Sequence, residues 1–576
     1  MPRSHYHLTA GMAAMLLASC GKSVVDRRAE NASEIVVTGQ RVDEARAAQA
    51  AKSSDASIVD MIAPSPYASP PPPAMAVGQA MQRFSTEPGM VIPPYYHDVG
   101  RDKFTSVAQN PFKVAREEPV STFSIDVDTA SYSFVRGSLN QNLLPQPAAV
   151  RTEEMVNYFP YDYASPKSAE QPFTSNIAVF PSPFTAGRKL VRIGIKGSAI
   201  QRATRPRANL VFLIDTSGSM NEPNKLPLVK QSLAMLVNQL DANDRVSIVT
   251  YAGYAGTALE PTPASDKGRI LAAIKQLGAG GGTAGAEGIR QAYALAERNF
   301  DAKGVNRVIL STDGDFNIGI TNQDELKGYI ERERDKGVFL SVLGFGMGNY
   351  NDALMQALAQ NGNGTAAYID TIGEARKTLV EEATSTLFPI AKDVKIQVEF
   401  NPATVAEYRL IGYETRLLDR DDFNNDRVDA GDVGSGQTVT ALYEIVPVGG
   451  PRSIGDLRYA TPARAMARAG GSEYGFVKIR YKLPKSTVSR LISTPISRSS
   501  EVARFEHAPQ DARFATGVAA FAELLRGGKY NGALRYDDVL RIAEGAKGED
   551  RFGYRAEFLQ MVRAAKVAAP LQAAER

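Results

Sequence analysis

The sequence predicts an α/β fold: a doubly wound, mainly parallel sheet over residues 207–388, flanked by β-rich regions and followed by a C-terminal helical segment. Three observations predict it. Continuous apolar runs alternate with amphipathic segments over residues 207–388, as strands buried on both faces alternate with the helices that cover them. On either side, segments such as 189–197 and 394–400 alternate polar and apolar residues, which is typical of half-buried strands. Residues 510–567 carry apolar side chains at helical spacing.

The central elements follow one another in a regular order. The first helix carries Leu226, Val229 and Leu233 at spacings of three and four, so that one face is apolar. A glycine-rich loop, residues 278–283, precedes a later helix. In sheets of this kind the ligand site lies at the carboxyl ends of the strands. We expect strands at 209–214, 245–251, 307–310, 338–343 and 366–369, helices at 226–240, 267–277, 285–299, 322–335 and 373–387, and one more helix between the last two strands.

The rest of the folded part divides around this central domain. We expect an N-terminal β-rich region at 96–206, a C-terminal β-rich region at 389–505 and a helical segment at 506–576. The last of these should contain a helix bearing Phe514 and Phe521, then helices around 535–545 and 552–566. Because the two ends of a domain often lie close together, the β segments before and after the central domain could pair into one shared domain.

Composition limits the classes of function. The 66 basic and 63 acidic residues nearly balance, and no basic block suggests a nucleic-acid partner. Only four histidines and one cysteine occur, which argues against a histidine-based triad, a zinc site and a disulfide framework. The sequence also lacks a G-x-S-x-G motif. We therefore expect no catalytic residues and a protein that is not an enzyme.

The N-terminus is typical of an exported protein. Residues 1–19 combine Arg3 with a short apolar run, which is the layout of a signal peptide, and residues 20–95 form a proline-rich tether without hydrophobic periodicity. The segment ending in Ser19-Cys20 resembles the bacterial lipobox. That resemblance implies acylation of Cys20 and a lipid anchor, and Gly21 resembles the residue found in lipoproteins of the outer membrane, facing the periplasm or the exterior. The alternative is a signal peptide cut elsewhere, with Cys20 unmodified.

Oxygen-bearing side chains gather where the central strands should end. The first strand runs into Asp215, Ser217 and Ser219, the glycine-rich loop ends in Thr283, and a later strand runs into Asp313. We expect these residues on loops from three strand ends. Hard cations prefer oxygen ligands, and Mg²⁺ commonly uses only one or two carboxylates. The set therefore favours Mg²⁺, with Mn²⁺ or Ca²⁺ as alternatives.

These residues resemble the metal-ion-dependent adhesion site (MIDAS) of von Willebrand factor type A (VWA) domains. That site has the pattern D-x-S-x-S followed by a threonine and an aspartate, which this sequence matches at Asp215, Ser217, Ser219, Thr283 and Asp313. The resemblance implies a VWA fold and a metal that accepts an acidic side chain from a protein partner. Phe316 and Asn317 could shape the rim of the binding surface, or could simply cap the loop that follows.

Longer segments resemble YfbK-like bacterial VWA lipoproteins, in which the VWA domain lies between two family-specific regions. The resemblance rests on residues 121–136 (STFSIDVDTASYSFVR), 153–163 (EEMVNYFPYDY) and 421–445. It covers most of residues 100–570 and implies the same domain order here.

A second metal site is conceivable in the segment 421–432. Asp422, Asn424 and Asp426 stand at alternate positions, as in a calcium loop, but Arg427 occupies the position where an EF-hand loop has glycine. A solvated loop between two strands is the better interpretation.

Four functions compete. Metal-dependent adhesion or complex assembly at the cell envelope fits the oxygen-rich set best. A structural lipoprotein with a non-functional metal site is the alternative, and a metal-dependent hydrolase is a weaker one because no general base is evident beside the set. A receptor-coupled role through Ile35–Val37, which resembles a TonB box, is a further hypothesis.

Overall fold

The computed structural model describes residues 102–167, 171–314, 323–348, 350–455 and 471–575, all within one compact unit spanning 92–576. The signal peptide, Cys20, the tether with Ile35–Val37, and the rim residues Phe316 and Asn317 lie outside the described residues. Among the described helices, none combines the length and apolar character that crossing a bilayer requires.

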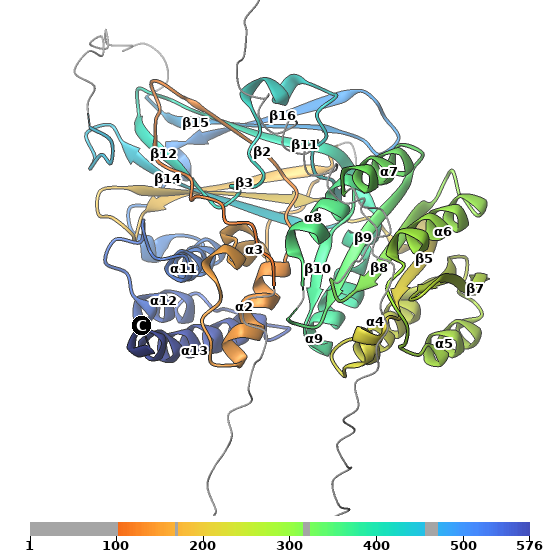
Figure 1. The fold of residues 1–576 in the computed structure, drawn as a ribbon. Coiled ribbons are helices and arrows are strands. Elements are labelled where there is room, and N and C mark those ends of the chain that lie inside the picture. Colours follow the sequence, from red (N-terminus) through yellow and green to blue (C-terminus); the bar gives the residue numbers. More distant parts are fainter. Residues whose placement is uncertain (1–101, 168–170, 315–322, 349, 456–470, 576) are drawn as a thin grey trace, which may run out of the picture. The chain divides into compact units, whose positions relative to one another are not determined.

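The central domain is a six-stranded sheet with strand order β10-β9-β8-β5-β6-β7 (Figure 1). All neighbours are parallel except β6 and β7, which are antiparallel. The predicted mainly parallel sheet is therefore confirmed. Its strands are β5 (Ala208–Asp215), β6 (Arg245–Tyr251), β7 (Ala255–Pro263), β8 (Val305–Thr312), β9 (Val338–Phe345) and β10 (Ala366–Ile369).

Helices cover both faces of this sheet. Along β5, Leu210 and Phe212 pack into the cluster formed with helices α4, α5 and α9. The alternate residues Val211 and Leu213 pack with α6, α7 and α8 on the opposite face. Successive side chains of this apolar strand point to opposite faces of the sheet, so the strand contributes to the hydrophobic core on each face. The helices are α4 (Leu226–Gln239), α5 (Lys267–Gln276), α6 (Gly285–Arg298), α7 (Gln323–Asp335), α8 (Asp352–Asn361) and α9 (Ile372–Arg376).

Two elements of the central domain differ from expectation. Strand β7 was not predicted, because its sequence AGTALEPTP holds two prolines and no apolar run; it is an edge strand, the position in which proline is tolerated. The single helix expected at 373–387 is instead divided into α9, a π-helical turn (Lys377–Glu381) and α10 (Ala383–Leu387).

Strands that precede the central domain in the sequence pair with strands that follow it, and together they build two antiparallel sheets. The first has the order β1-β12-β14-β4-β3, and the second has the order β13-β11-β15-β16 with β2 beside β11. The pairs β4–β14, β1–β12 and β2–β11 each join a strand before the central domain to one after it. The expected shared β domain is therefore confirmed. The strands are β1 (Lys113–Val114), β2 (Val120–Ser124), β3 (Phe173–Pro181), β4 (Lys189–Gly197), β11 (Pro389–Phe400), β12 (Val405–Ile411), β13 (Val433–Gly434), β14 (Thr438–Pro447), β15 (Glu473–Lys482) and β16 (Ser489–Ser497).

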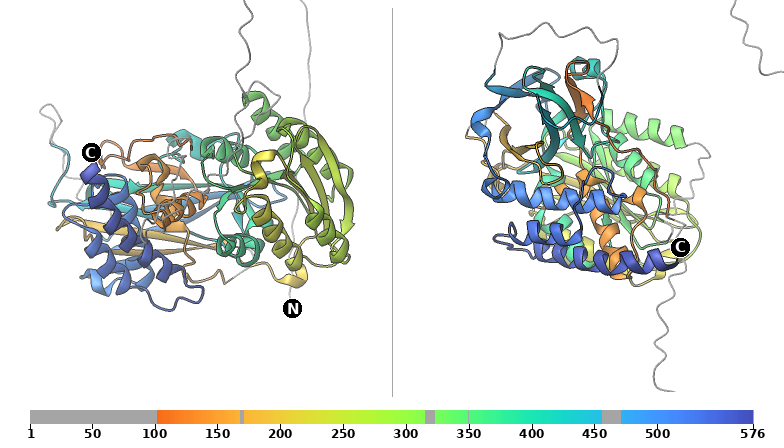
Figure 2. Two further views of the ribbon diagram at one scale, coloured as in Figure 1. Left: turned by 60° about the horizontal axis from the view of Figure 1, so that its bottom comes forward. Right: turned by 90° about the vertical axis from the view of Figure 1, so that its left-hand side faces the viewer.

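The region before the central domain is not only β-rich. It also contains α2 (Ala130–Asn140) and α3 (Thr152–Asn157), which share a core with the C-terminal helices α11 (Gln510–Leu525), α12 (Tyr536–Glu544) and α13 (Tyr554–Glu575). Figure 2 shows these blue C-terminal helices lying together. The three expected C-terminal helices are confirmed, and their partners include helices that the sequence pattern did not reveal.

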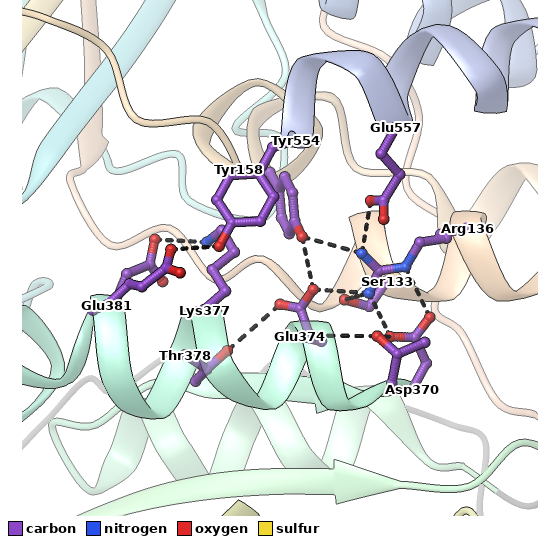
Figure 3. Close-up of polar contacts among 12 residues, drawn as sticks. Ser133, Arg136, Tyr158, Asp370, Glu374, Lys377, Thr378, Glu381, Tyr554 and Glu557 are labelled. Carbon is purple, nitrogen blue, oxygen red and sulfur yellow. Dashed lines mark hydrogen bonds and ion pairs between the residues drawn. The ribbon is translucent and has the colours of Figure 1, made fainter. Parts of the chain in front are cut away.

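A buried arginine joins three of these parts (Figure 3). The Arg136 guanidinium of α2 donates to Asp370 after β10 at 2.9 Å, to Glu374 of α9 at 2.8 Å and to Glu557 of α13 at 2.8 Å. Its side chain is only 5% exposed, and that of Glu374 only 1%. Asp370 and Glu374 have little access to water, at 8% and 1% exposure, so their charges depend on this cation, whereas Glu557 is 40% exposed.

We expect Arg136→Met to lower the free energy of unfolding by about 3–5 kcal/mol, because it leaves buried carboxylates without their cation. Arg563→Met is the matched control on α13, because the Arg563–Glu544 pair is about half exposed, at 46% and 49%, and should cost less than about 1 kcal/mol. Urea denaturation followed by circular dichroism measures both. Equal losses in the two variants would contradict the role assigned to Arg136.

Candidate metal centre

The two predicted carboxylates lie at one edge of the central sheet. Asp215 is the last residue of β5, and Asp313 directly follows β8. These strands are parallel neighbours, so their carboxyl ends meet at the same edge. Both side chains are fully buried, at 0% exposure. The two carboxylates are therefore positioned by the two central strands of the sheet.

Backbone and hydroxyl donors hold the Asp215 carboxylate. The Ser217 N–H donates to Oδ1 at 2.9 Å, while the Tyr251 hydroxyl and the Thr312 hydroxyl donate to Oδ2 at 3.1 and 3.2 Å. Tyr251 ends β6 and Thr312 ends β8, so three adjacent strand ends orient one carboxylate. Burial, with a smaller effect from the charge of Asp313, raises the pKa of Asp215 to about 6. A nearby cation would stabilise its ionised form.

The two serines continue from the end of β5. Ser217 Oγ and Ser219 Oγ are 3.1 Å apart, in hydrogen-bonding contact. Ser217 is buried and Ser219 is exposed, at the start of a short 3₁₀ turn (Gly218–Asn221). The alternation in D-x-S-x-S thus brings the two serine hydroxyls together just past the end of β5.

Thr283 requires a correction. The expectation placed it on a strand-end loop, but its loop connects α5 to α6, because the unpredicted β7 runs antiparallel and reverses the chain. The loop still reaches the site edge through backbone hydrogen bonds. Gly218 N–H donates to the Gly281 carbonyl at 3.1 Å, and Gly280 N–H donates to the Thr216 carbonyl at 2.8 Å. Gly281 has a φ of +87°, which favours glycine.

Two residues of the site edge escaped the sequence analysis. Lys225, just before α4, places its Nζ 3.1 Å from Asp313 Oδ2. Tyr254, between β6 and β7, is 78% exposed. The Tyr254 carbonyl accepts from Ala252 N–H, and the Ala252 carbonyl accepts from Ala284 N–H, so this turn borders the Thr283 loop. No periodic pattern marks either residue, since a lysine before a helix and a lone loop tyrosine are common on surfaces.

The donor set fits a hard divalent cation. Asp215 and Asp313 offer carboxylate oxygens, and Ser217, Ser219 and Thr283 offer hydroxyls, without sulfur or imidazole. Among the described residues no group of three or more His, Cys, Asp or Glu is placed to hold a metal, so an ion at this edge must rely on hydroxyl and water oxygens as well as carboxylates. This chemistry suits Mg²⁺, then Mn²⁺ or Ca²⁺, and disfavours soft metals.

The segment considered for calcium has other partners. Asp422 accepts from the Asp419 N–H in a capping box of the 3₁₀ turn Arg420–Asn424. Asp426 accepts from Arg480 and Ser489. The Lys395 ammonium donates to backbone carbonyls of this loop, at Asp422 and at Asn425. Asp422 and Asp426 thus turn to protein donors, and the calcium hypothesis stays a prediction from the sequence.

The chain is similar to several known families and proteins. Residues 209–382 match the von Willebrand factor type A domain family, residues 98–192 match a family described as von Willebrand factor, and residues 385–567 match the C-terminal part of the uncharacterized protein YfbK. An uncharacterized Synechocystis protein is 29% identical over 194 residues, covering 34% of this chain and 45% of its own length. Among solved structures, a von Willebrand factor type A protein from Catenulispora acidiphila has 15% identity and a TM-score of 0.40, and covers 70% of this chain and 91% of its own.

The most extensive of these similarities is to YfbK of Escherichia coli (strain K12). The two proteins are 43% identical over 470 residues, which cover 80% of this chain and 81% of that protein. The resemblance of the sequence to VWA domains and to YfbK-like proteins is thereby confirmed. Identity at this level over four fifths of both chains, together with the matching C-terminal region, shows that the chain belongs to the YfbK family and carries a VWA domain.

Proposed function

We propose that this protein is a lipid-anchored envelope protein whose VWA domain binds a protein partner through a divalent metal. One observation carries the proposal: Asp215, Ser217 and Ser219 are joined by hydrogen bonds at the carboxyl edge of the sheet, beside Asp313. VWA domains commonly bind protein ligands, and the oxygen donors here suit Mg²⁺, with Mn²⁺ or Ca²⁺ as alternatives. The role is binding in adhesion or complex assembly, and we assign no catalytic residue.

Different groups of the protein would orient the carboxylate, supply oxygen ligands and contact the partner. The Ser217 N–H and the Tyr251 and Thr312 hydroxyls fix the orientation of the Asp215 carboxylate. The neutral hydroxyls of Ser217, Ser219 and Thr283 add oxygen without adding charge. With only two carboxylates nearby, a bound divalent ion keeps enough positive charge to attract an acidic side chain from a partner. Tyr254, 78% exposed, offers an aromatic surface for the same partner.

A structural role without a working metal site is the second candidate, and one observation favours it. The Lys225 ammonium already contacts the Asp313 carboxylate at 3.1 Å, so a positive charge is built into the edge where the ion would bind. The two functions make opposite predictions for metal binding.

We expect the purified chain to bind Mg²⁺ and Mn²⁺ in calorimetry, and Asp215→Ala to abolish the binding, because it removes one of the two carboxylates. The variant should remain folded by circular dichroism, since Asp215 is the last residue of β5 and belongs to neither hydrophobic core that flanks the sheet. Glu331→Ala, on the exposed side of α7 in the same domain, is the matched control and should bind as the wild type does. Equal binding by the wild type and a folded Asp215→Ala protein would overturn the site assignment.

Partner binding should depend on the ion. In a pull-down from envelope extract with Mg²⁺, the immobilised chain should retain a protein that chelator releases and that the Asp215→Ala chain does not retain. The physical reason is that the partner carboxylate binds the ion rather than the protein alone. Retention that is equal with Mg²⁺, with chelator and with the variant would favour the structural role.

The lipid anchor makes a separate prediction. Cys20→Ser should remove incorporation of a labelled fatty acid and leave a protein that either keeps its signal segment or becomes soluble, because the thiol is the acylated group. Ser23→Ala, three residues further on, should keep the label and the membrane fraction. A mature N-terminus mapped downstream of Cys20, without lipid, would contradict the anchor.

A further inference from the structure

We propose that Lys225 is a built-in counter-ion of the metal centre, whose ammonium competes with a divalent ion for Asp313 and thereby weakens metal binding. The proposal rests on the metal-binding function proposed above and concerns the regulation of that same site. It begins from the contact between Lys225 Nζ and Asp313 Oδ2 at 3.1 Å, where the lysine side chain is 6% exposed and the aspartate 0%.

The surrounding backbone leads the lysine side chain to this position. Lys225 directly precedes α4, and its carbonyl accepts from the Val229 N–H at 2.9 Å, which fixes its main chain at the helix start. Gly346, just after β9, has a φ of +76° and lies against the lysine stem; a Cβ at position 346 would overlap the Lys225 side-chain carbons. The glycine therefore leaves room for the stem. The lysine is enclosed by the fold, unlike a surface lysine that happens to reach an acid.

The charges around the ammonium explain why it stays there. Glu222 lies three residues before Lys225, and its Oε1 is 4.0 Å from Lys225 Nζ. Because the Glu222 side chain is 62% exposed, water screens this pair. Asp313 is fully buried, and its charge is screened far less. The stronger attraction is therefore toward Asp313, one of the two carboxylates of the proposed site.

A divalent ion held by Asp313 would lie within a few ångströms of this ammonium. Repulsion between a single and a double positive charge at that separation exceeds the free energy of a tenfold change in affinity, even at an effective dielectric constant of about 20. Lys225 must therefore either move away or remain at a cost in metal affinity. In both cases the lysine lowers the affinity for the metal. An acidic partner adds negative charge and raises that affinity, and by linkage the bound metal raises the affinity for the partner by the same factor.

The lysine also stabilises the chain when no divalent ion is bound, because it places a positive charge beside a buried carboxylate. The ammonium and the divalent ion are thus two alternative cations for the same aspartate. This arrangement keeps the site edge folded at low metal concentration and makes occupancy depend on both the ion and the partner.

The test is calorimetric titration of the full chain with Mn²⁺ and Mg²⁺. We expect Lys225→Met to bind at least about tenfold more tightly than the wild type. Lys225→Arg, which keeps the charge, should bind no more tightly than the wild type. Lys230→Met is the matched control: Lys230 lies in α4, which Lys225 precedes, and donates to the backbone carbonyls of Lys275 and Leu277, so its removal should change affinity less than about twofold.

Thermal unfolding supplies the second measurement. In chelator, Lys225→Met should melt below the wild type, and Mg²⁺ should raise its melting temperature by more than it raises that of the wild type. A variant that folds only with Mg²⁺ would support the proposal, because the ion then replaces the lysine. A Lys225→Met chain that is unfolded in both conditions, or that is folded and binds metal no more tightly than the wild type, would overturn it.

The outcomes separate this proposal from the function on which it rests. If Lys225→Met matches the wild type while Asp215→Ala abolishes binding, the counter-ion role fails and the metal site stands. If only Lys225→Met binds metal, the lysine is the resident cation and the structural role is favoured over metal-dependent adhesion. If neither the wild type nor Lys225→Met binds, both proposals fail.

Discussion

The backbone pairing of β4 with β14 is the constraint on which the rest of the architecture depends. It runs from Lys196 opposite Thr438 to Lys189 opposite Ile445, so residues from before the VWA domain bond to residues from after it. The pairing of β2 with β11 repeats the connection in the second sheet. Because buried backbone groups must find partners, these ladders bring the two ends of the VWA domain back to one body. The domain is therefore an insertion held at both ends.

Buried arginines fix how the inserted domain meets its surroundings. Arg136 connects α2 to the end of β10, to α9 and to α13, while Arg151 connects Glu154 of α3 to Asp352 at the start of α8. Moving such charges out of water costs free energy, so these clusters are better understood as devices that select one arrangement than as net stabilisers. Each holds an element that covers the sheet whose edge carries Asp215.

Buried charge also shapes the proposed metal centre. Asp215 and Asp313 are buried side by side, and burial raises the pKa of Asp215 to about 6. Hydroxyl and N–H donors compensate the Asp215 charge only in part, so the two carboxylates together attract a cation. At Asp313 the Lys225 ammonium supplies that positive charge. In the function proposed above, a divalent ion would take this place at both carboxylates, in competition with the lysine.

The sequence by itself determined the α/β class and the central strands, because strands buried on both faces leave continuous apolar runs. It also determined the resemblance to a metal-binding site, because the D-x-S-x-S spacing is a local pattern; the residues are Asp215, Ser217, Ser219, Thr283 and Asp313. Strand β7, the π-helical turn at Lys377–Glu381 and the α5–α6 position of the Thr283 loop were decided by tertiary structure. So was the contact of Lys225 with Asp313, 88 residues apart. An edge strand forms because a neighbouring strand pairs with it, and a buried ion pair forms because the fold brings distant residues together. Neither produces a periodic pattern in the sequence.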